Sequence, residues 1–405
     1  MTPEAANEHR VPLWTRDFSL HFAASFLVAV ALNFVIVLVP VFAAREFSAS
    51  SGDVGMLTAV FMLTAVLSRP YLGFLLDRYG RRIVLLIALA FFSLLNGAHA
   101  LVGSLGALLA IRALLGFPWG ATQTATITAA VDLIPESRRG EGLAFFGLTF
   151  TLAGTVGPLA SLGLLEYTSF DTVFLTAAGI ILAAGSIAVF TRHAVIRDAE
   201  ARLSLRSLLE PRVAWLAAAT MLTTTLWGAV ISFMPLYASE QGLPSAGVYF
   251  TLDALGTMAS RIGSARLFDR YGPRPILIAA YLLMISSMLL LGITPTQTGY
   301  AASAILLGVG FGIAIPAYQT MAMNLVEPER RGAANGTLYS AFDIGIGGGA
   351  LALGALADSA GFRTMFTVQS VLLLIPTAMF LIHIIPSYQR RMRAVREETT
   401  LQDVL

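Results

Sequence analysis

The chain has 405 residues, of which 56% are hydrophobic and 12% are charged, with a formal net charge of +2. Ordinary soluble domains have about a quarter of their residues charged, so this chain has too few charges to cover a water-facing surface, and lipid must form part of its solvent. It contains no cysteine, which excludes disulfides, thiolate catalysis and cysteine metal sites.

Long apolar runs follow one another along the whole chain. A membrane-spanning helix needs roughly 20 mostly apolar residues, and the first run is too long for the core of a signal peptide. Continuous runs also exclude a transmembrane β-barrel, whose strands are short and alternate. Twelve spans are predicted, at Phe18–Ala44, Val54–Leu76, Ile83–Val102, Leu105–Val131, Leu143–Leu165, Val173–Phe190, Val213–Tyr237, Ser245–Leu267, Ile276–Ile293, Tyr300–Leu325, Thr337–Ala357 and Met365–Ile385.

The distribution of arginine predicts the orientation in the membrane. The 26 lysine and arginine residues are all arginine. With the N-terminus placed inside, 20 of them fall in inner segments and two, Arg45 and Arg363, in outer loops. Cytoplasmic segments of membrane proteins carry an excess of basic residues. Both termini are therefore predicted to be cytoplasmic.

Several short matches at one offset of 192 residues indicate an internal repeat. The matching pairs are Asp77-Arg78-Tyr79-Gly80 with Asp269-Arg270-Tyr271-Gly272, Ser68-Arg69 with Ser260-Arg261, and Arg138-Arg139-Gly140 with Arg330-Arg331-Gly332. The predicted fold is an all-α membrane protein of two pseudo-symmetric six-helix bundles. Residues 1–190 form the first half, 191–212 a cytoplasmic linker and 213–405 the second half. Parallel repeats place a substrate site near the midplane between the halves.

The end of the linker, Leu203–Leu209, carries leucines among arginines. This pattern fits either a segment lying along the inner membrane surface or a solvated linker.

The segment from Gly73 to Arg82, GFLLDRYGRR, resembles the loop signature between helices two and three of the major facilitator superfamily. The second copy departs from it, because Ala265 replaces the glycine and Pro273 an arginine. The resemblance covers essentially the whole chain and implies a gate on the inner side.

The helix dipole disfavours an anion at the C-terminal end of a helix, so Asp77 needs a cation or a helix N-terminus nearby. The family suggests the start of helix eleven, near Asn335, for this role. The predicted gating residues are Gly73, Asp77, Arg78, Gly80, Arg81, Arg82, Asp269, Arg270, Gly272 and Arg274, with Asp132 and Glu141 at inner helix ends. The alternative is that these arginines only enforce topology.

Helices four and five carry two further resemblances. The run from Arg112 to Gly120, RALLGFPWG, is similar to an arginine signature of proton-coupled members, although Leu115 stands where glutamine is usual. A buried arginine is costly in a membrane unless it is paired or hydrated. The Gly154-Thr-Val-Gly157-Pro158 run partly matches the antiporter pattern of helix five and favours export. Glycine-rich helices also serve plain close packing.

Two carboxylates, Asp253 and Asp343, lie deep within predicted helices. Burial penalises the charged form of a carboxyl group, so such groups can exchange protons near neutral pH. Asp343 ranks first for proton coupling because it precedes the glycine run Gly345–Gly349, which permits a bend. Arg112 is the third candidate. The alternative for both acids is a structural pair with Arg112, Arg261 or a polar neighbour.

These features predict a monomeric secondary transporter of a bacterial cell membrane, similar to drug:proton antiporters, and not an enzyme. Its partners are a small-molecule substrate, protons and the bilayer, without nucleic acid. No metal or cofactor is expected, because the histidines lack ligand spacing and no phosphate-binding Gly-Lys loop occurs. Candidate cavity residues are Asn33, Phe34, Trp119, Gln123, Thr223, Trp227, Tyr318 and Gln319.

Proton-coupled export of small amphipathic or drug-like molecules fits this set, because few charges occur among the cavity candidates. The alternatives are export or import of a specific metabolite or metal-chelating small molecule. A polytopic enzyme or receptor-like protein is disfavoured, because neither a catalytic constellation nor a sensor domain is visible.

Overall fold

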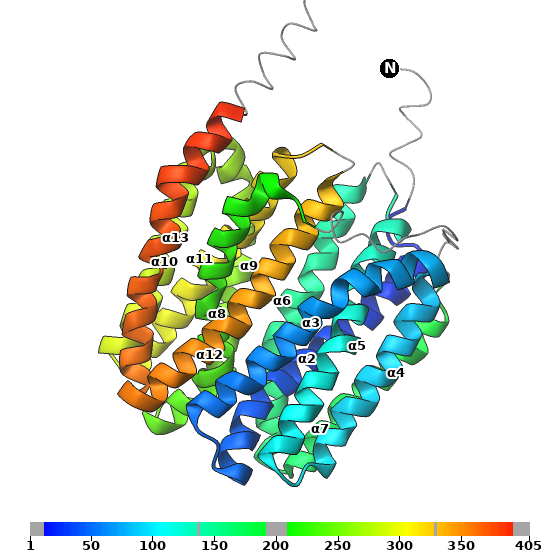
Figure 1. Ribbon diagram of the computed structural model, residues 1–405, viewed down its shortest axis with the longest axis vertical. Helices are drawn as coiled ribbons and strands as arrows, with labels where there is room; N and C mark the ends of the chain where they lie inside the picture. Colours follow the sequence, from blue (N-terminus) through cyan, green and yellow to red (C-terminus); the bar gives the residue numbers. More distant parts are fainter. Residues whose placement is uncertain (1–11, 136–137, 192–208, 328–329, 392–405) are drawn as a thin grey trace, which may run out of the picture. The chain divides into compact units, whose positions relative to one another are not determined.

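A computed structural model describes residues 12–135, 138–191, 209–327 and 330–391, and every regular element in these ranges is helical (Figure 1). The chain forms two compact units, one of Met1–Ala49 and Val60–Leu203 and the other of Ser50–Ala59 and Ser204–Leu405. Helix α3 contributes to both, because its first residues pack with the second unit.

The first unit packs α2 against α6 and α7, and α4 against α5 and α7. Its elements are α2 (Arg16–Phe47), most of α3 (Ser51–Tyr79), α4 (Arg81–Ala98), η1 (His99–Leu101), α5 (Leu105–Leu133), α6 (Arg139–Leu165) and α7 (Phe170–Val189).

The second unit packs α8 along α12 and α9 along α11, with α10 against α11 and α12. Its elements are η4 (Pro211–Val213), α8 (Ala214–Glu240), α9 (Ala246–Tyr271), α10 (Pro273–Ile293), α11 (Gln297–Asn324), α12 (Arg331–Leu372), α13 (Leu374–Met379) and η6 (Phe380–Ile384). Figure 1 shows α8, in green, beside α12, in orange.

Ten helical runs among the described residues are long and apolar enough to cross a membrane. Large apolar side chains are exposed on their outer faces, among them Leu67 and Leu94, each 66% exposed. Apolar surface on this scale is unstable in water and is normal where side chains face lipid.

Polar side chains cap the starts of several helices. Ser104 accepts a hydrogen bond from the Ala107 amide at the start of α5, and Thr296 accepts one from Gly299 at the start of α11. Helix α12 joins two predicted spans, and Gly361 breaks it with a φ of 79°. Only glycine adopts such a backbone readily, so the chain turns there before the final span.

Helix packing repeats at the same 192-residue offset as the sequence. A Cβ at Gly120 of α5 would lie 2.8 Å from the Ala65 carbonyl oxygen, and one at Gly312 of α11 would lie 3.1 Å from that of Thr257. The two turns of the repeated loop match as well, with φ of 89° at Gly80 and 76° at Gly272. Each unit therefore uses corresponding glycines to bring two helices into backbone contact.

Candidate functional site

Asp253 is a buried carboxylate about two turns after the start of α9, and its residue surface is 7% exposed. Its Oδ1 atom has no hydrogen-bond partner among the described residues. At the repeat offset Asp253 corresponds to Phe61 of the first unit, and the Arg112 guanidinium lies 4.2 Å from the centroid of that ring. Each unit thus places one charged group at a corresponding pair of helices. In the first unit it is the cation Arg112, at α3 and α5, and in the second it is the acid Asp253, at α9 and α11.

A group of aromatic rings in the second unit connects α8, α9, α11 and α12. Trp227 stacks on Phe311 with centroids 5.3 Å apart, and Phe250 lies edge-on to Trp227 at 6.4 Å. Phe342 packs against Phe311 at 6.1 Å. We call these four residues the aromatic group. Phe250 precedes Asp253 by one helical turn, and Phe342 directly precedes Asp343, so both deep acids lie next to it in the chain.

Asp343 is also buried, at 5% exposure, and it has an interaction partner. Two of the glycines that follow it, Gly345 and Gly349, serve close packing. A Cβ at Gly349 would lie 2.6 Å from the Thr225 carbonyl oxygen of α8, and one at Gly345 would overlap the carbonyl of Met221. This stretch of α12 is therefore held against α8.

Two buried hydroxyl chains run through the second unit. The Thr223 hydroxyl lies 3.0 Å from that of Tyr281, which in turn hydrogen-bonds to Tyr318. Tyr249 lies one turn before Asp253 in α9, and its hydroxyl lies 3.1 Å from Ser303 Oγ. Two cavity candidates, Thr223 and Tyr318, are thus brought together by a tyrosine that the sequence did not single out.

The remaining cavity candidate of this unit, Gln319, donates from Nε2 to the Tyr339 hydroxyl over 3.1 Å. Phe250 is buried, whereas Trp227, Phe311 and Phe342 are only partly buried. These three members of the aromatic group therefore keep surface for contact with a solute.

The cavity candidates of the first unit are mostly packing residues. Trp119 is 4% exposed, with its ring 5.8 Å from Phe92, and Phe34 is 3% exposed. Gln123 accepts a hydrogen bond from Arg69 over 2.8 Å. Asn33 packs against α6, where a Cβ at Gly157 would lie 2.6 Å from its own Cβ. The glycine pattern of helix five thus provides close packing at this point.

Arginines at one end of the first unit are paired with acids. Arg81 Nε lies 2.7 Å from Asp132 Oδ2, with the side chains 14% and 17% exposed. Arg138 forms a two-pronged pair with Glu141, at 2.8 Å in each prong, on the exposed surface. Arg82 donates to the Val189 carbonyl oxygen over 2.6 Å.

The other gating candidates of the repeated loop are less engaged. The Arg78 and Arg270 guanidinium groups lie over the rings of Tyr79 and Tyr271, at 5.9 and 5.2 Å, and Arg274 is exposed. The environment of Gly73 and the side chains of Asp77 and Asp269 lie outside the described part of the structure. The predicted partner of Asp77, the helix start near Asn335, is described, but its contact with Asp77 stays a prediction. The linker segment Leu203–Leu209, apart from its last residue, also lies outside it.

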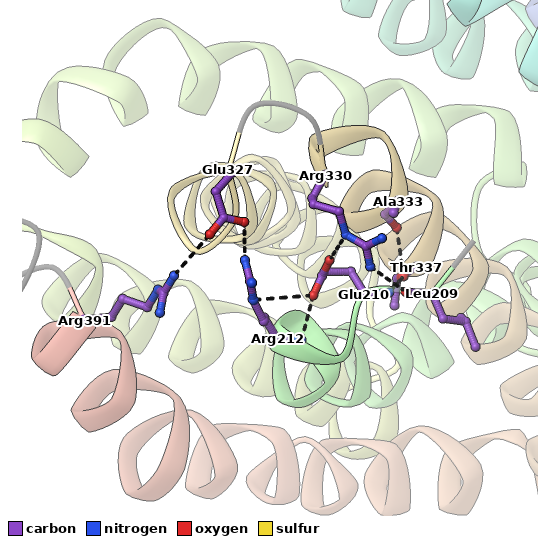
Figure 2. Close-up of polar contacts among 8 residues, drawn as sticks. All are labelled: Leu209, Glu210, Arg212, Glu327, Arg330, Ala333, Thr337 and Arg391. Carbon is purple, nitrogen blue, oxygen red and sulfur yellow. Dashed lines mark hydrogen bonds and ion pairs between the residues drawn. The ribbon is translucent and has the colours of Figure 1, made fainter. Parts of the chain in front are cut away.

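Figure 2 shows an ion-pair cluster where the linker enters α8. Glu210 is 3% exposed and accepts from Arg330 Nε over 2.7 Å and from the Arg212 amide over 3.2 Å. Its own amide donates to Thr337 Oγ1 over 2.9 Å. Arg212 also hydrogen-bonds to Glu327. We call Glu210, Arg212, Glu327, Arg330 and Arg391 the Glu210 cluster.

The charged forms of the two carboxylates of the Glu210 cluster, Glu210 and Glu327, are favoured by their arginine partners. Burial disfavours the charged carboxylate, but the hydrogen bonds from Arg330 and Arg212 outweigh it and hold the pKa of Glu210 below its ordinary value. A lowered pKa stabilises the folded state above the ordinary carboxyl range, and this contribution is lost as the pH falls through the folded-state value. The cluster therefore ties the linker to α12 under physiological conditions.

Glu210 and Glu327 were not among the predicted site residues. The local signal was present, because an acidic residue before proline is typical of a helix start. The partner Arg330, at the N-cap of α12, lies 120 residues away, however, and a capping signal does not reveal so distant a contact.

The sequence matches the profile of the Major Facilitator Superfamily over residues 22–297 and again over 244–401. The chain belongs to this superfamily. It is a multi-pass transporter of a bacterial cell membrane and not an enzyme, with small molecules as substrates.

Among superfamily members, it is 27% identical over 385 residues to "Multidrug resistance protein MdtG" of Citrobacter koseri, covering 89% of this chain and 93% of that protein. It is 24% identical over 349 residues to "Staphylopine export protein" of Staphylococcus aureus, covering 82% and 87%. A solved variant of nucleoside transporter NupG shares the fold with a TM-score of 0.76 at 16% identity, covering 90% and 99%.

Proposed function

We propose that this superfamily member exports small amphipathic molecules in exchange for protons by alternating access. The observation that carries the proposal is Asp253, a buried carboxylate one turn from a partly exposed aromatic group. Such a carboxylate can bind and release a proton as its surroundings change. Aromatic rings bind apolar and cationic solutes. The similarity to a multidrug resistance protein supports this cargo class.

Asp253 takes precedence over Asp343 in this proposal. The sequence ranked Asp343 first because its glycine run could permit a bend, but Gly345 and Gly349 of that run pack against α8. Asp343 also has an interaction partner, whereas one oxygen of Asp253 lacks a hydrogen-bond partner in the described ranges. Arg112 is the proposed electrostatic counterpart in the first unit, because a buried arginine of a membrane helix is rarely without function.

The function is tested with purified protein in proteoliposomes that carry an imposed pH gradient. Accumulation of ethidium, a fluorescent aromatic cation, against its own concentration gradient is the expected result, and a protonophore should abolish it. Ethidium transport that is the same with and without the pH gradient would contradict proton coupling. The direction of proton-driven efflux from intact cells then separates export from uptake.

Export of one specific metabolite is the second candidate, and the similarity to a staphylopine export protein favours it. The same liposomes separate the two candidates. A panel of unrelated amphipathic dyes that compete with one another indicates a broad exporter. Transport of a single polar metabolite, with no dye moving, indicates the narrow one.

The proposed topology has twelve spans and cytoplasmic termini. Counting α9 as a span and dividing the run Arg331–Arg391 at Gly361 raises the ten apolar runs to twelve. The arginine distribution supports the orientation. We expect reporter tags at either terminus, or inserted within residues 192–208, to be protected from membrane-impermeant reagents in intact cells. Labelling of any of the three from outside would contradict the topology.

The arginine-rich end of the first unit is the proposed inner gate, and its partly buried pair is the sensitive point. We expect Asp132→Asn to slow transport about fivefold or more, since contacts that favour one conformation typically differ by about 1–3 kcal/mol. The matched control is Glu141→Gln, which breaks an exposed pair of little energetic weight. Initial transport rates at equal expression provide the measurement. Equal rates in the wild type and the Asp132 variant would leave this pair with no gating role.

A further inference from the structure

A pocket of about 200 Å³ lies in the second unit, between the start of α8, the end of α11 and the last described helical turns. Its lining includes Arg212, Trp215, His383, Ser387, Tyr388 and Arg391. Because α8 starts and α11 ends here, the pocket lies where membrane-spanning helices reach the water boundary.

The mouth of this pocket carries an excess of positive charge. Figure 2 shows Glu327 between Arg212 and Arg391. Arg212 hydrogen-bonds to this carboxylate, while Arg391 Nη2 lies 3.8 Å from its Oε1. The whole Glu210 cluster has three guanidinium groups and two carboxylates, so a net positive charge remains. The Arg391 side chain is 49% exposed, so its donors can reach another anion.

One wall of the pocket is built for an amphipathic ligand. The Trp215 ring is 57% exposed and stacks on His383, with centroids 5.0 Å apart and planes 13° from parallel. Ile382, which is 65% exposed, follows on the outer face of η6. Tryptophan is enriched at the headgroup level of membranes, and an apolar flank would suit acyl chains better than water.

The chain continues this pattern past the pocket. Arg390, Arg391, Arg393 and Arg396 follow the last span in the sequence. Basic clusters next to a span are typical of segments that bind anionic lipid. Guanidinium groups pair well with phosphate, because their donors match the phosphate oxygens.

We propose that this pocket binds the phosphate headgroup of an anionic phospholipid, with Arg391 and Arg212 contacting the phosphate and Trp215 flanking the upper acyl chains. The site is separate from the proposed transport residues, and the proposal does not depend on the cargo or on proton coupling. It would anchor the end of the chain to the start of α8 through a lipid.

The test titrates the purified full-length protein in detergent with phosphatidylglycerol or phosphatidylcholine and follows its thermal unfolding temperature. Phosphatidylglycerol should raise this temperature more than phosphatidylcholine does. We expect Arg391→Gln to weaken the apparent affinity for phosphatidylglycerol about fivefold, the effect of one arginine near an anionic surface. Arg45→Gln is the matched control, because it removes an exposed arginine of a predicted outer loop that is absent from the pocket lining and from the basic cluster, and it should change the affinity less than about twofold.

A third variant distinguishes a lipid site from a purely structural ion pair. Glu327→Gln removes the competing carboxylate, so it should strengthen phosphatidylglycerol binding while Arg391→Gln weakens it. If the pair were only structural, both variants would lower the unfolding temperature in the same direction without a change in lipid affinity. Equal responses to the two lipids, equal effects at Arg45 and Arg391, or full replacement of the lipid effect by inorganic phosphate would each overturn the proposal.

Discussion

Replacing Asp253 with asparagine should reduce the accumulation of cargo driven by a pH gradient by more than about tenfold, because an ionisable group in the membrane interior is expected to be functional. Asparagine has nearly the same size and imitates the protonated acid, so the packing of α9 on α11 should survive. A permanently neutral residue cannot carry a proton through the transport cycle. Exchange of cargo down its own gradient, which needs no proton, should therefore persist in part.

Asp343→Asn is the matched comparison for this variant, since it also neutralises a buried acid of the same unit. If Asp253 carries the proton, Asp343→Asn should reduce gradient-driven accumulation less than Asp253→Asn does. Any loss in the Asp343 variant should be equally large for accumulation and for downhill exchange. Both rates are measured in the same proteoliposomes at equal protein density. Full gradient-driven accumulation in the Asp253 variant would refute the assignment. Its loss in the Asp343 variant alone would restore Asp343 to first place.

Replacing Gly308 with alanine should destabilise the second unit. The added Cβ would overlap the Asp253 carbonyl oxygen and lie 2.9 Å from the Thr257 amide nitrogen. Both are backbone atoms of α9, so no flexible side chain can move to make room. Overpacking of this kind typically costs about 1–3 kcal/mol, and the thermal unfolding temperature in detergent should fall accordingly.

Gly348→Ala is the control, because nothing lies within 4 Å of a Cβ at that position. Alanine inside a helix stabilises it by about 0.5–1 kcal/mol relative to glycine, so this variant should unfold at the same or a higher temperature. Gly116 is the counterpart of Gly308 in the first unit, and a Cβ there would lie 2.8 Å from the Ala65 amide nitrogen. Gly116→Ala should therefore lower the unfolding temperature as Gly308→Ala does. Equal unfolding temperatures for Gly308→Ala and Gly348→Ala would contradict the packing argument.

The sequence by itself determined the solvent, the helical architecture, the repeat and the family. Each of these properties depends on short stretches of the sequence. A span is a run of apolar residues, and the loop from Gly73 to Arg82 is a contiguous motif. The glycines that open the turns, Gly80 and Gly272, also occupy fixed places within that motif.

Only the tertiary structure decided which side chains meet. Glu210 and Arg330 lie 120 residues apart, and the stacking of Trp227 on Phe311 joins α8 to α11. Helices in a membrane are apolar on nearly every side, so periodicity does not tell which face turns inward. The roles of Gly157 and Gly345 were ambiguous for the same reason, because a glycine that permits bending and one that permits close packing look alike until the opposing helix is in place.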